Sequence, residues 1–421
     1  MRNATLVLVA AVALWALPAR ADDFFFKDGD VVVMIGDSIT EQHLYSNYVE
    51  MWTVTRFPNW KLTFRNTGIG GDTSPGGNKR FHRDVAAYKA TALTVDFGMN
   101  DGGYRGRVFN EERFRTYMKG LQGIADQAAA AKIRVAWVTP QPLDTAEQGQ
   151  TALTGYNETL EKFSAGVKEI AEKNKGLFVD QFHPYLKVLD RARSADPKYT
   201  RITAGDAVHP GPPGQALMAA AILKGLHFPA LVSSVEIDAG TKTATAVKNC
   251  KVAELAARDG GIAFQRHDEA LPFFPSEATS ILKWAPILEE LNDYRLKVTG
   301  LKEGRYEVRL GGQKAAEFSA GELAKGVNLA AAALTAGPVK AQVAAVKAAV
   351  EKKNRFHHDK IFRGLVLSIP PEWKKLPPAE IEKQRKAQVA ERMAALPDLD
   401  AQVAQALVIK PHTVEVLPAQ K

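Results

Sequence analysis

Apolar segments and helix-like segments alternate through the first half of the chain. The apolar segments are short and rich in β-branched residues, as buried strands are. Parallel strands must be joined by crossovers, and these are usually helices that cover both faces of the sheet. The pattern therefore predicts an α/β fold with a parallel sheet. Strands are expected at residues 31–35, 61–66, 92–97, 133–138 and 177–180, and helices at 43–56, 77–89, 111–131, 152–174 and 212–227.

The chain of 421 residues is longer than one ordinary domain. The alternating pattern ends near Pro229, so we expect an α/β domain at residues 22–230. Short segments in which apolar and polar residues alternate follow, separated by glycines, and they predict a half-exposed antiparallel sheet. We therefore expect a β-rich region at 231–320, packed against the α/β domain. The Ala- and Lys-rich remainder predicts a helical region at 321–421, with helices near 338–357 and 379–395.

An apolar loop at residues 271–275 interrupts the β-rich region. It could cover an interface or reach toward a substrate, and packing is the favoured role. The sequence His357-His358-Asp359 carries metal-binding residue types, but adjacent residues on a helix face different directions. We therefore expect no metal site there.

The first 21 residues have the features of a secretory signal peptide. Arg2 provides a positive charge, residues 6–17 are apolar, and Ala19-Arg20-Ala21 fits an A-x-A cleavage site. The apolar stretch is too short to span a bilayer, and no later segment approaches the length needed. We expect a secreted or periplasmic protein without an integral membrane segment after cleavage, with an uncleaved anchor as the alternative.

The charge and the cysteine content of the chain exclude one class of binding partner and one kind of covalent cross-link. The formal net charge is +8, yet no basic patch is interleaved with aromatic residues, so we expect no nucleic-acid binding. Cys250 is the only cysteine, so the chain can form no internal disulfide. A structural role is expected for this thiol.

The segment 31–40 combines the first apolar strand with a possible nucleophile. Gly36 allows a sharp turn after the strand, and Ser38 follows at the carboxyl end, where open α/β sheets bind ligands. The alternative is that Asp37 and Ser38 only cap the next helix. A catalytic serine needs a base, a group that orients the base, and donors for an oxyanion.

Residues that could meet these needs follow other predicted strands. Gly71 lies in a glycine-rich loop after the second strand, and its backbone N–H could approach a substrate closely. Asn100 follows the third strand, and its amide could donate to an oxyanion. A tight turn and an Asx turn are the respective alternatives. Asp206 and His209 lie three residues apart, so the carboxylate could orient the imidazole as a base.

The four segments that contain Ser38, Gly71, Asn100 and the Asp206–His209 pair closely resemble, in this order, the conserved blocks of the SGNH (GDSL-type) serine esterases. The resemblance covers residues 30–228 and implies a flavodoxin-like, three-layer α/β/α domain with a five-stranded parallel sheet. It implies that Ser38 is the nucleophile, that Gly71 and Asn100 are oxyanion donors, and that Asp206 and His209 complete a triad. No metal or organic cofactor is required. We expect about 3.5 Å or less between Ser38 Oγ and His209 Nε2, and roughly 2.6–3.2 Å from His209 Nδ1 to Asp206.

Export and the resemblance together suggest the function. We expect an ester hydrolase that releases short acyl groups, with acetyl esters of carbohydrate as the first choice. A lipase or lysophospholipase-like enzyme is the alternative, although no long apolar groove is evident. A binding module that has lost activity is a third reading, and the intact site residues argue against it.

Overall fold

The computed structural model describes residues 23–103, 108–145, 155–196 and 198–419. The first unit is built on a five-stranded parallel sheet with the order β2-β1-β3-β4-β5. The α/β fold and the parallel sheet expected from the sequence are confirmed. The strands are β1 (Val31–Gly36), β2 (Thr63–Asn66), β3 (Ala92–Asp96), β4 (Arg134–Val138) and β5 (Leu177–Val179).

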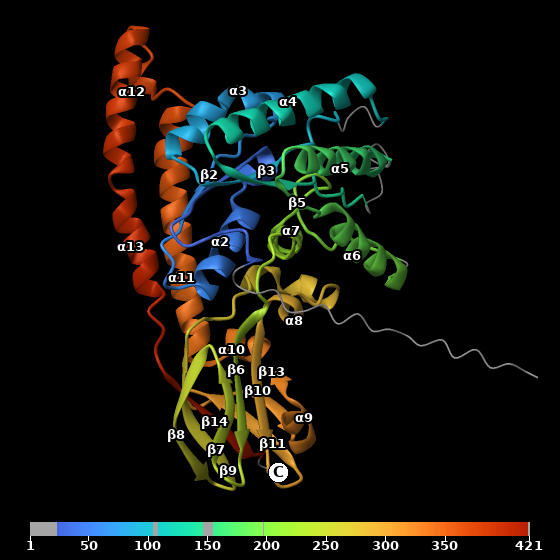
Figure 1. The fold of residues 1–421 in the computed structure, drawn as a ribbon, viewed down its shortest axis with the longest axis vertical. Helices are drawn as coiled ribbons and strands as arrows, with labels where there is room; N and C mark the ends of the chain where they lie inside the picture. The colour runs from blue at the N-terminus through green and yellow to red at the C-terminus, as the bar shows by residue number, and fades with distance from the viewer. Residues whose placement is uncertain (1–22, 104–107, 146–154, 197, 420–421) are drawn as a thin grey trace, which may run out of the picture.

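Helices cover both faces of this sheet (Figure 1). Val32 and Met34 point into a core shared with α2, α6 and α7, whereas Val33 and Ile35 point into a core shared with α3, α4 and α5. Successive side chains of a strand point to opposite faces, so burial on both faces explains the uninterrupted apolar run of β1. The helices are α1 (Ser38–Glu41), α2 (Leu44–Arg56), α3 (Ser74–Asp84), α4 (Glu111–Ala130), α5 (Tyr156–Lys173), α6 (Phe182–Ala195) and α7 (Pro212–Gly225), with a 3₁₀ turn η2 (Ala86–Tyr88).

The second unit is a pair of packed β-sheets. One has the order β13-β10-β6-β7 and the other β12-β11-β14-β9-β8, and their inward residues share one core. Between β9 and β10 the chain forms the 3₁₀ helix η4 (Ser276–Lys283) and α8 (Ile287–Leu291). The strands are β6 (Leu231–Asp238), β7 (Thr243–Lys248), β8 (Cys250–Arg258), β9 (Gly261–Asp268), β10 (Asp293–Thr299), β11 (Arg305–Leu310), β12 (Gln313–Ser319), β13 (Val327–Asn328) and β14 (His412–Pro418).

Two features of this unit differ from the expectation. β6 and β10 pair in parallel, although the remaining pairs in both sheets are antiparallel. The region expected to be helical at 321–421 also ends in a strand, since β14 lies between β11 and β9. Both differences arise from pairing between segments far apart in the chain, which local alternation does not reveal.

The last long helices run back along the first unit (Figure 1). In α11, Lys353 forms a buried ion pair with Glu50 of α2, and Asn354 donates to the second oxygen of Glu50 at 2.7 Å. The helices after β12 are α9 (Ala320–Lys325), α10 (Ala330–Thr335), α11 (Gly337–Phe356), a π-helix (His357–Val366), η6 (Pro371–Trp373), α12 (Pro378–Met393) and α13 (Leu396–Ala406).

The apolar loop at 271–275 packs between the two units. Phe273 is fully buried, and its ring centroid lies 5.1 Å from that of Trp52 in α2. The favoured packing role is therefore confirmed.

Two further expectations from the sequence concern membrane-spanning segments and the signal peptide. Within the described ranges, no helix is long and apolar enough to cross a membrane. The expected signal peptide at 1–21 lies outside the described residues.

Candidate active site

Ser38 begins α1 immediately after β1. Asp37 caps this short helix, and its Oδ1 accepts a hydrogen bond from the Ile39 N–H at 2.9 Å. The turn requires glycine at position 36, because a Cβ there would lie 2.1 Å from Thr40 Oγ1 and 2.7 Å from the Asp96 carbonyl oxygen. This close approach brings Ser38 to the carboxyl edge of the sheet, between the ends of β2 and β3.

Asp206 and His209 lie in a tight loop before α7. The Asp206 N–H donates to the His209 carbonyl at 3.1 Å, and an isolated bridge joins Gly205 to Pro210. Gly205 has a φ of +69°, and a Cβ there would lie 2.2 Å from the His209 carbonyl oxygen. Asp206 Oδ1 accepts from the backbone N–H groups of Val208 at 2.8 Å and His209 at 2.7 Å. The loop therefore fixes the carboxylate and the imidazole relative to each other.

Two residues after β4 attach this loop to the domain, and the sequence reasoning missed both. Asp144 is buried and accepts from the hydroxyls of Thr203 at 3.0 Å and Tyr199 at 3.1 Å. Gln141 donates to the Val208 carbonyl at 3.2 Å. Both residues follow the carboxyl end of β4, and the other candidate site residues also lie at this edge of the sheet. This position could have indicated that they support the site.

A hydrogen-bond chain joins three of the predicted residues. Ser38 Oγ lies 2.9 Å from His209 Nε2, and His209 Nδ1 lies 3.0 Å from Asp206 Oδ2. Both distances fall in the ranges expected from the sequence. An imidazole with its proton on Nδ1 can donate to Asp206 and accept from the Ser38 hydroxyl at the same time.

Local hydrogen bonds govern the charge of Asp206. Partial burial raises its pKa, but the backbone and ring N–H groups of His209 and the Val208 N–H outweigh this effect. The pKa of Asp206 is therefore lowered overall. The carboxylate remains ionised at neutral pH, where it can stabilise a protonated imidazole.

Gly71 and Asn100 lie at the same edge, in the loops after β2 and β3. The Asn100 side-chain amide donates to Asp37 Oδ2 at 3.2 Å and to the Asp72 carbonyl at 3.0 Å. Asn100 thus contacts the immediate neighbours of Ser38 and Gly71. Gly71 is exposed, and neither its N–H nor that of Ser38 donates to any of the described residues. The structure therefore brings all five predicted residues to one edge of the sheet.

Buried carboxylates lie behind this edge. The pKa of Asp37 is raised to about 7, mainly by burial and also by the nearby Asp101 and Asp72, against the hydrogen bond from Ile39. The pKa of Asp101 is raised to about 6, mainly by burial, and that of Asp96 well above its ordinary value for the same reason. Sequence reasoning treated Asp37 only as a possible helix cap.

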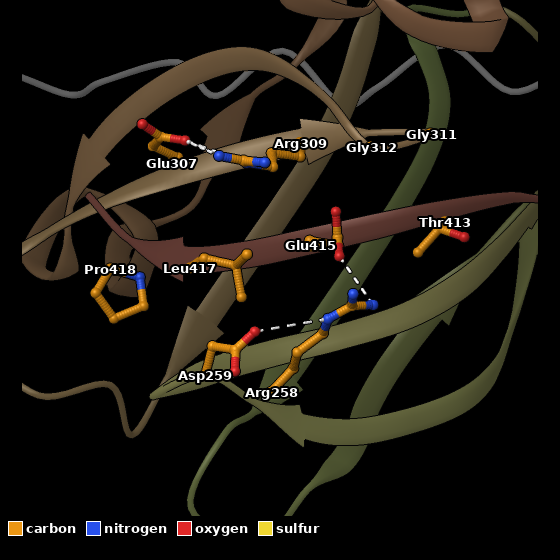
Figure 2. Close-up of a pocket in the computed structure, with 10 residues that line it drawn as sticks. All are labelled: Arg258, Asp259, Glu307, Arg309, Gly311, Gly312, Thr413, Glu415, Leu417 and Pro418. Atoms are coloured by element: carbon orange, nitrogen blue, oxygen red, sulfur yellow. Dashed lines mark hydrogen bonds and ion pairs between the residues drawn. The ribbon is translucent and has the colours of Figure 1, made fainter. Parts of the chain in front are cut away.

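A groove of about 830 Å³ lies elsewhere, on the outer face of the five-stranded sheet of the second unit (Figure 2). Charged side chains that line it pair with one another: Arg258 with Glu415 at 3.0 Å, and Arg309 with Glu307 at 2.9 Å. The residues that line this groove include none of the five predicted site residues. It is therefore separate from the candidate active site.

Comparison with known proteins gives some similarities that cover slightly less than half of the chain and one that covers nearly all of it. The model of the GDSL-like lipase/acylhydrolase family matches residues 34–217. An acetylxylan esterase from Geobacillus stearothermophilus is 26% identical over 222 residues, covering 48% of this chain and 95% of that protein. A solved acetylxylan esterase structure from the same organism aligns over 48% of this chain and 95% of its own, with 24% identity and a TM-score of 0.40. The structure of a gut microbial diltiazem-metabolizing enzyme aligns over 94% of this chain and 98% of its own, with 25% identity and a TM-score of 0.79.

The family match contains all five predicted site residues. The alignment with the diltiazem-metabolizing enzyme extends over both units, so the whole arrangement recurs in another enzyme. Over residues 34–217 the chain is similar to the GDSL-like lipase/acylhydrolase family, and it is a hydrolase of ester bonds.

Proposed function

We propose that the protein is an exported serine esterase that removes short acyl groups, acetyl above all, from carbohydrate esters. The observation that carries the catalytic part is the hydrogen-bond chain from Ser38 Oγ through His209 to Asp206, with distances of 2.9 and 3.0 Å. This arrangement activates a serine hydroxyl, because the imidazole accepts its proton during attack.

In the proposed acylation step, Ser38 Oγ forms a bond to the ester carbonyl carbon, and its proton moves to His209 Nε2. The tetrahedral intermediate then collapses, the bond to the leaving alkoxide oxygen breaks, and that oxygen takes the proton from His209. Water repeats the sequence on the acyl-enzyme, which frees the carboxylic acid and restores Ser38. Asp206 remains ionised and holds the imidazole in the required tautomer throughout.

The oxyanion of each intermediate needs donors close to Ser38. We assign this role to the backbone N–H groups of Ser38 and Gly71 and to the Asn100 amide. The first two make no hydrogen bond within the described residues, so they are available to a substrate. The contacts of Asn100 with Asp37 and Asp72 support its place beside them.

Two observations support acetylated carbohydrate as the proposed substrate. The relative that matches 48% of the chain is an acetylxylan esterase, and the N-terminal sequence predicts export to where such polymers are found. The nearly full-length structural match metabolises diltiazem, which makes that compound a useful second substrate in the assay.

Acyl-chain selectivity tests the proposal. We expect p-nitrophenyl acetate to be hydrolysed with a kcat/KM at least tenfold above that of the butyrate, with no measurable turnover of the palmitate. Acetate release from acetylated xylan should accompany this preference. A preference for palmitate would support a lipase-like enzyme instead, and no turnover of any ester would support the inactive binding module.

Replacement of the nucleophile tests the mechanism. Ser38→Ala should lower kcat by about 10⁶ without changing the unfolding temperature, since loss of a triad nucleophile has an effect of this order. A variant that keeps a tenth of the wild-type activity would exclude Ser38 as the nucleophile.

Export is tested by the N-terminus of the mature protein. We expect protein recovered from the periplasm or medium to begin at Asp22, after cleavage behind Ala21. Intact-mass measurement distinguishes this product from the full-length chain. Recovery of uncleaved protein in the membrane fraction would support an anchor.

A further inference from the structure

The Asp37 carboxylate makes two contacts, and helix capping accounts for only one. Oδ1 accepts from the Ile39 N–H at 2.9 Å, which caps α1. Oδ2 accepts from the Asn100 side-chain amide at 3.2 Å. A cap needs a single oxygen, and asparagine serves as well as aspartate in that position. The second oxygen therefore requires another explanation.

The surroundings of Asp37 make an ionised carboxylate costly. The residue is 3% exposed, and no cation forms an ion pair with it among the described residues. Asp101 and Asp72 lie close enough to disfavour its ionised form electrostatically. Asparagine would cap the helix without this cost. Residues that break such a local rule commonly serve a site.

The contacts of Asn100 indicate which site. Its amide hydrogens are directed to Asp37 Oδ2 and to the Asp72 carbonyl, so these two acceptors fix the plane of the amide. The contact with Asp37 is the longer of the two, at 3.2 Å against 3.0 Å. This N–H can therefore be shared with an oxyanion that forms beside Ser38.

We propose that Asp37 is a positioning residue that holds the Asn100 amide in the orientation needed to stabilise the oxyanion. The inference rests on the proposed function, in which Asn100 is an oxyanion donor. Asp37 acts through Asn100 and does not touch the substrate. Its effect should fall on the transition state and hence on kcat, with little change in KM.

Asp37→Asn separates positioning from capping. The variant keeps one oxygen for the Ile39 N–H, but an NH₂ group now faces the NH₂ group of Asn100. Two donors repel, so the Asn100 amide should turn away. We expect kcat on p-nitrophenyl acetate to fall 10- to 100-fold, with KM within threefold of wild type. A kcat above half of the wild-type value would leave Asp37 as a helix cap and overturn the proposal.

Asp101→Asn is the matched control. Asp101 is also buried and belongs to the same acidic cluster, but its Oδ1 accepts hydrogen bonds from the backbone N–H and the hydroxyl of Ser74. Asparagine keeps this oxygen, so kcat should stay within threefold of wild type. If Asp101→Asn lowers kcat as much as Asp37→Asn, neutralising the cluster explains both effects and the proposal fails.

A double-mutant cycle shows whether Asp37 acts through Asn100. Asn100→Ala alone should lower kcat by roughly 10²–10³, as expected for loss of one oxyanion donor. Adding Asp37→Asn to this variant should change kcat less than twofold. An additional 10-fold loss would show an independent role for Asp37 and contradict the proposal.

The same cycle distinguishes failure of this inference from failure of the proposed function. If Asn100→Ala leaves kcat unchanged, Asp37 has no donor to position and the inference is overturned. An inactive Ser38→Ala would still support the nucleophile in that case.

Discussion

Asp206 and Asp37 flank the Ser38–His209 pair in opposite surroundings. The Asp206 side chain is 60% exposed, and hydrogen bonds lower its pKa, whereas Asp37 is buried and its pKa is raised to about 7. Asp206 is therefore ionised at neutral pH. Asp37 instead changes its charge near neutral pH, so its ionisation is coupled to folding.

The raised pKa of Asp37 predicts a pH-dependent stability difference. The unfolded chain loses this proton near the ordinary value of 3.8, whereas the folded chain holds it up to about pH 7. The free energy of unfolding therefore falls as pH rises between these values, and the loss is complete above pH 7. Asp37→Asn removes this contribution.

The measurement is urea unfolding of wild type and Asp37→Asn at pH 4 and pH 8. The stability of the variant relative to wild type should increase on going to pH 8, by on the order of 4 kcal/mol or less. A difference that is the same at both pH values would contradict the raised pKa.

The sequence was enough to predict that the five candidate site residues lie at one edge of the sheet, because each lies in a short segment at a strand end or in one loop. The partners of those residues were not predictable in the same way. The contact between Asp37 and Asn100 joins residues 63 positions apart and depends on β1 and β3 being neighbours. The contact of Asp144 with Thr203 likewise depends on where the loop before α7 returns to the sheet.

At the scale of elements, the buried pair between Lys353 and Glu50 attaches α11 to α2. Both side chains are nearly inaccessible to water, and Asp400 lies 3.7 Å from the lysine. Removing one member of a buried pair leaves an uncompensated charge. We expect Lys353→Met to lower the free energy of unfolding by about 3–5 kcal/mol, measured in guanidinium chloride.

Two further variants make this test specific. The double variant Glu50→Gln, Lys353→Met removes both charges and should recover most of the loss. Lys347→Met changes a more exposed lysine of the same helix, paired with Glu351, and should cost about 1 kcal/mol or less. Equal losses for Lys353→Met and Lys347→Met would show that the buried pair has no special role.

Elements with a strong local pattern were predicted from the sequence, and those that depend on distant partners were not. The strands of the parallel sheet were found because burial on both faces leaves an uninterrupted apolar run. The parallel pairing of β6 with β10 was missed, since it depends on the segment 269–292 returning the chain to the same end of the sheet. The strand β14 was missed because its partners, β9 and β11, lie before a long helical stretch that separates them from it in the chain.

At the scale of the whole molecule, one apolar core extends through both units. It includes Val32 of β1, Phe273 of the apolar loop at 271–275 and Val416 of β14. A continuous core predicts that the two units unfold together. We expect a single calorimetric transition, with esterase activity lost over the same temperature range.

A substitution far from Ser38 tests this coupling. Val416→Ala removes two buried methyl groups from the second unit and should lower the temperature of activity loss by about 2–4 °C. Val247→Ala, the same change at a side chain that is 44% exposed, should have little effect. If Val416→Ala unfolds the second unit first while activity persists, the two units are independent.

The position of β14 in its sheet determines the order in which the two units can finish folding. Its residues hydrogen-bond to β9 on one side and β11 on the other, so the five-stranded sheet has a gap at its centre until this strand is present. All five strands of the parallel sheet, by contrast, lie within residues 31–179. The strands of the parallel sheet can therefore pair before β14 is available, whether the chain folds during synthesis or after export. Until β14 is in place, β9 and β11 each have an unpaired edge in the second unit. Chaperones that protect unpaired edges would act during this interval.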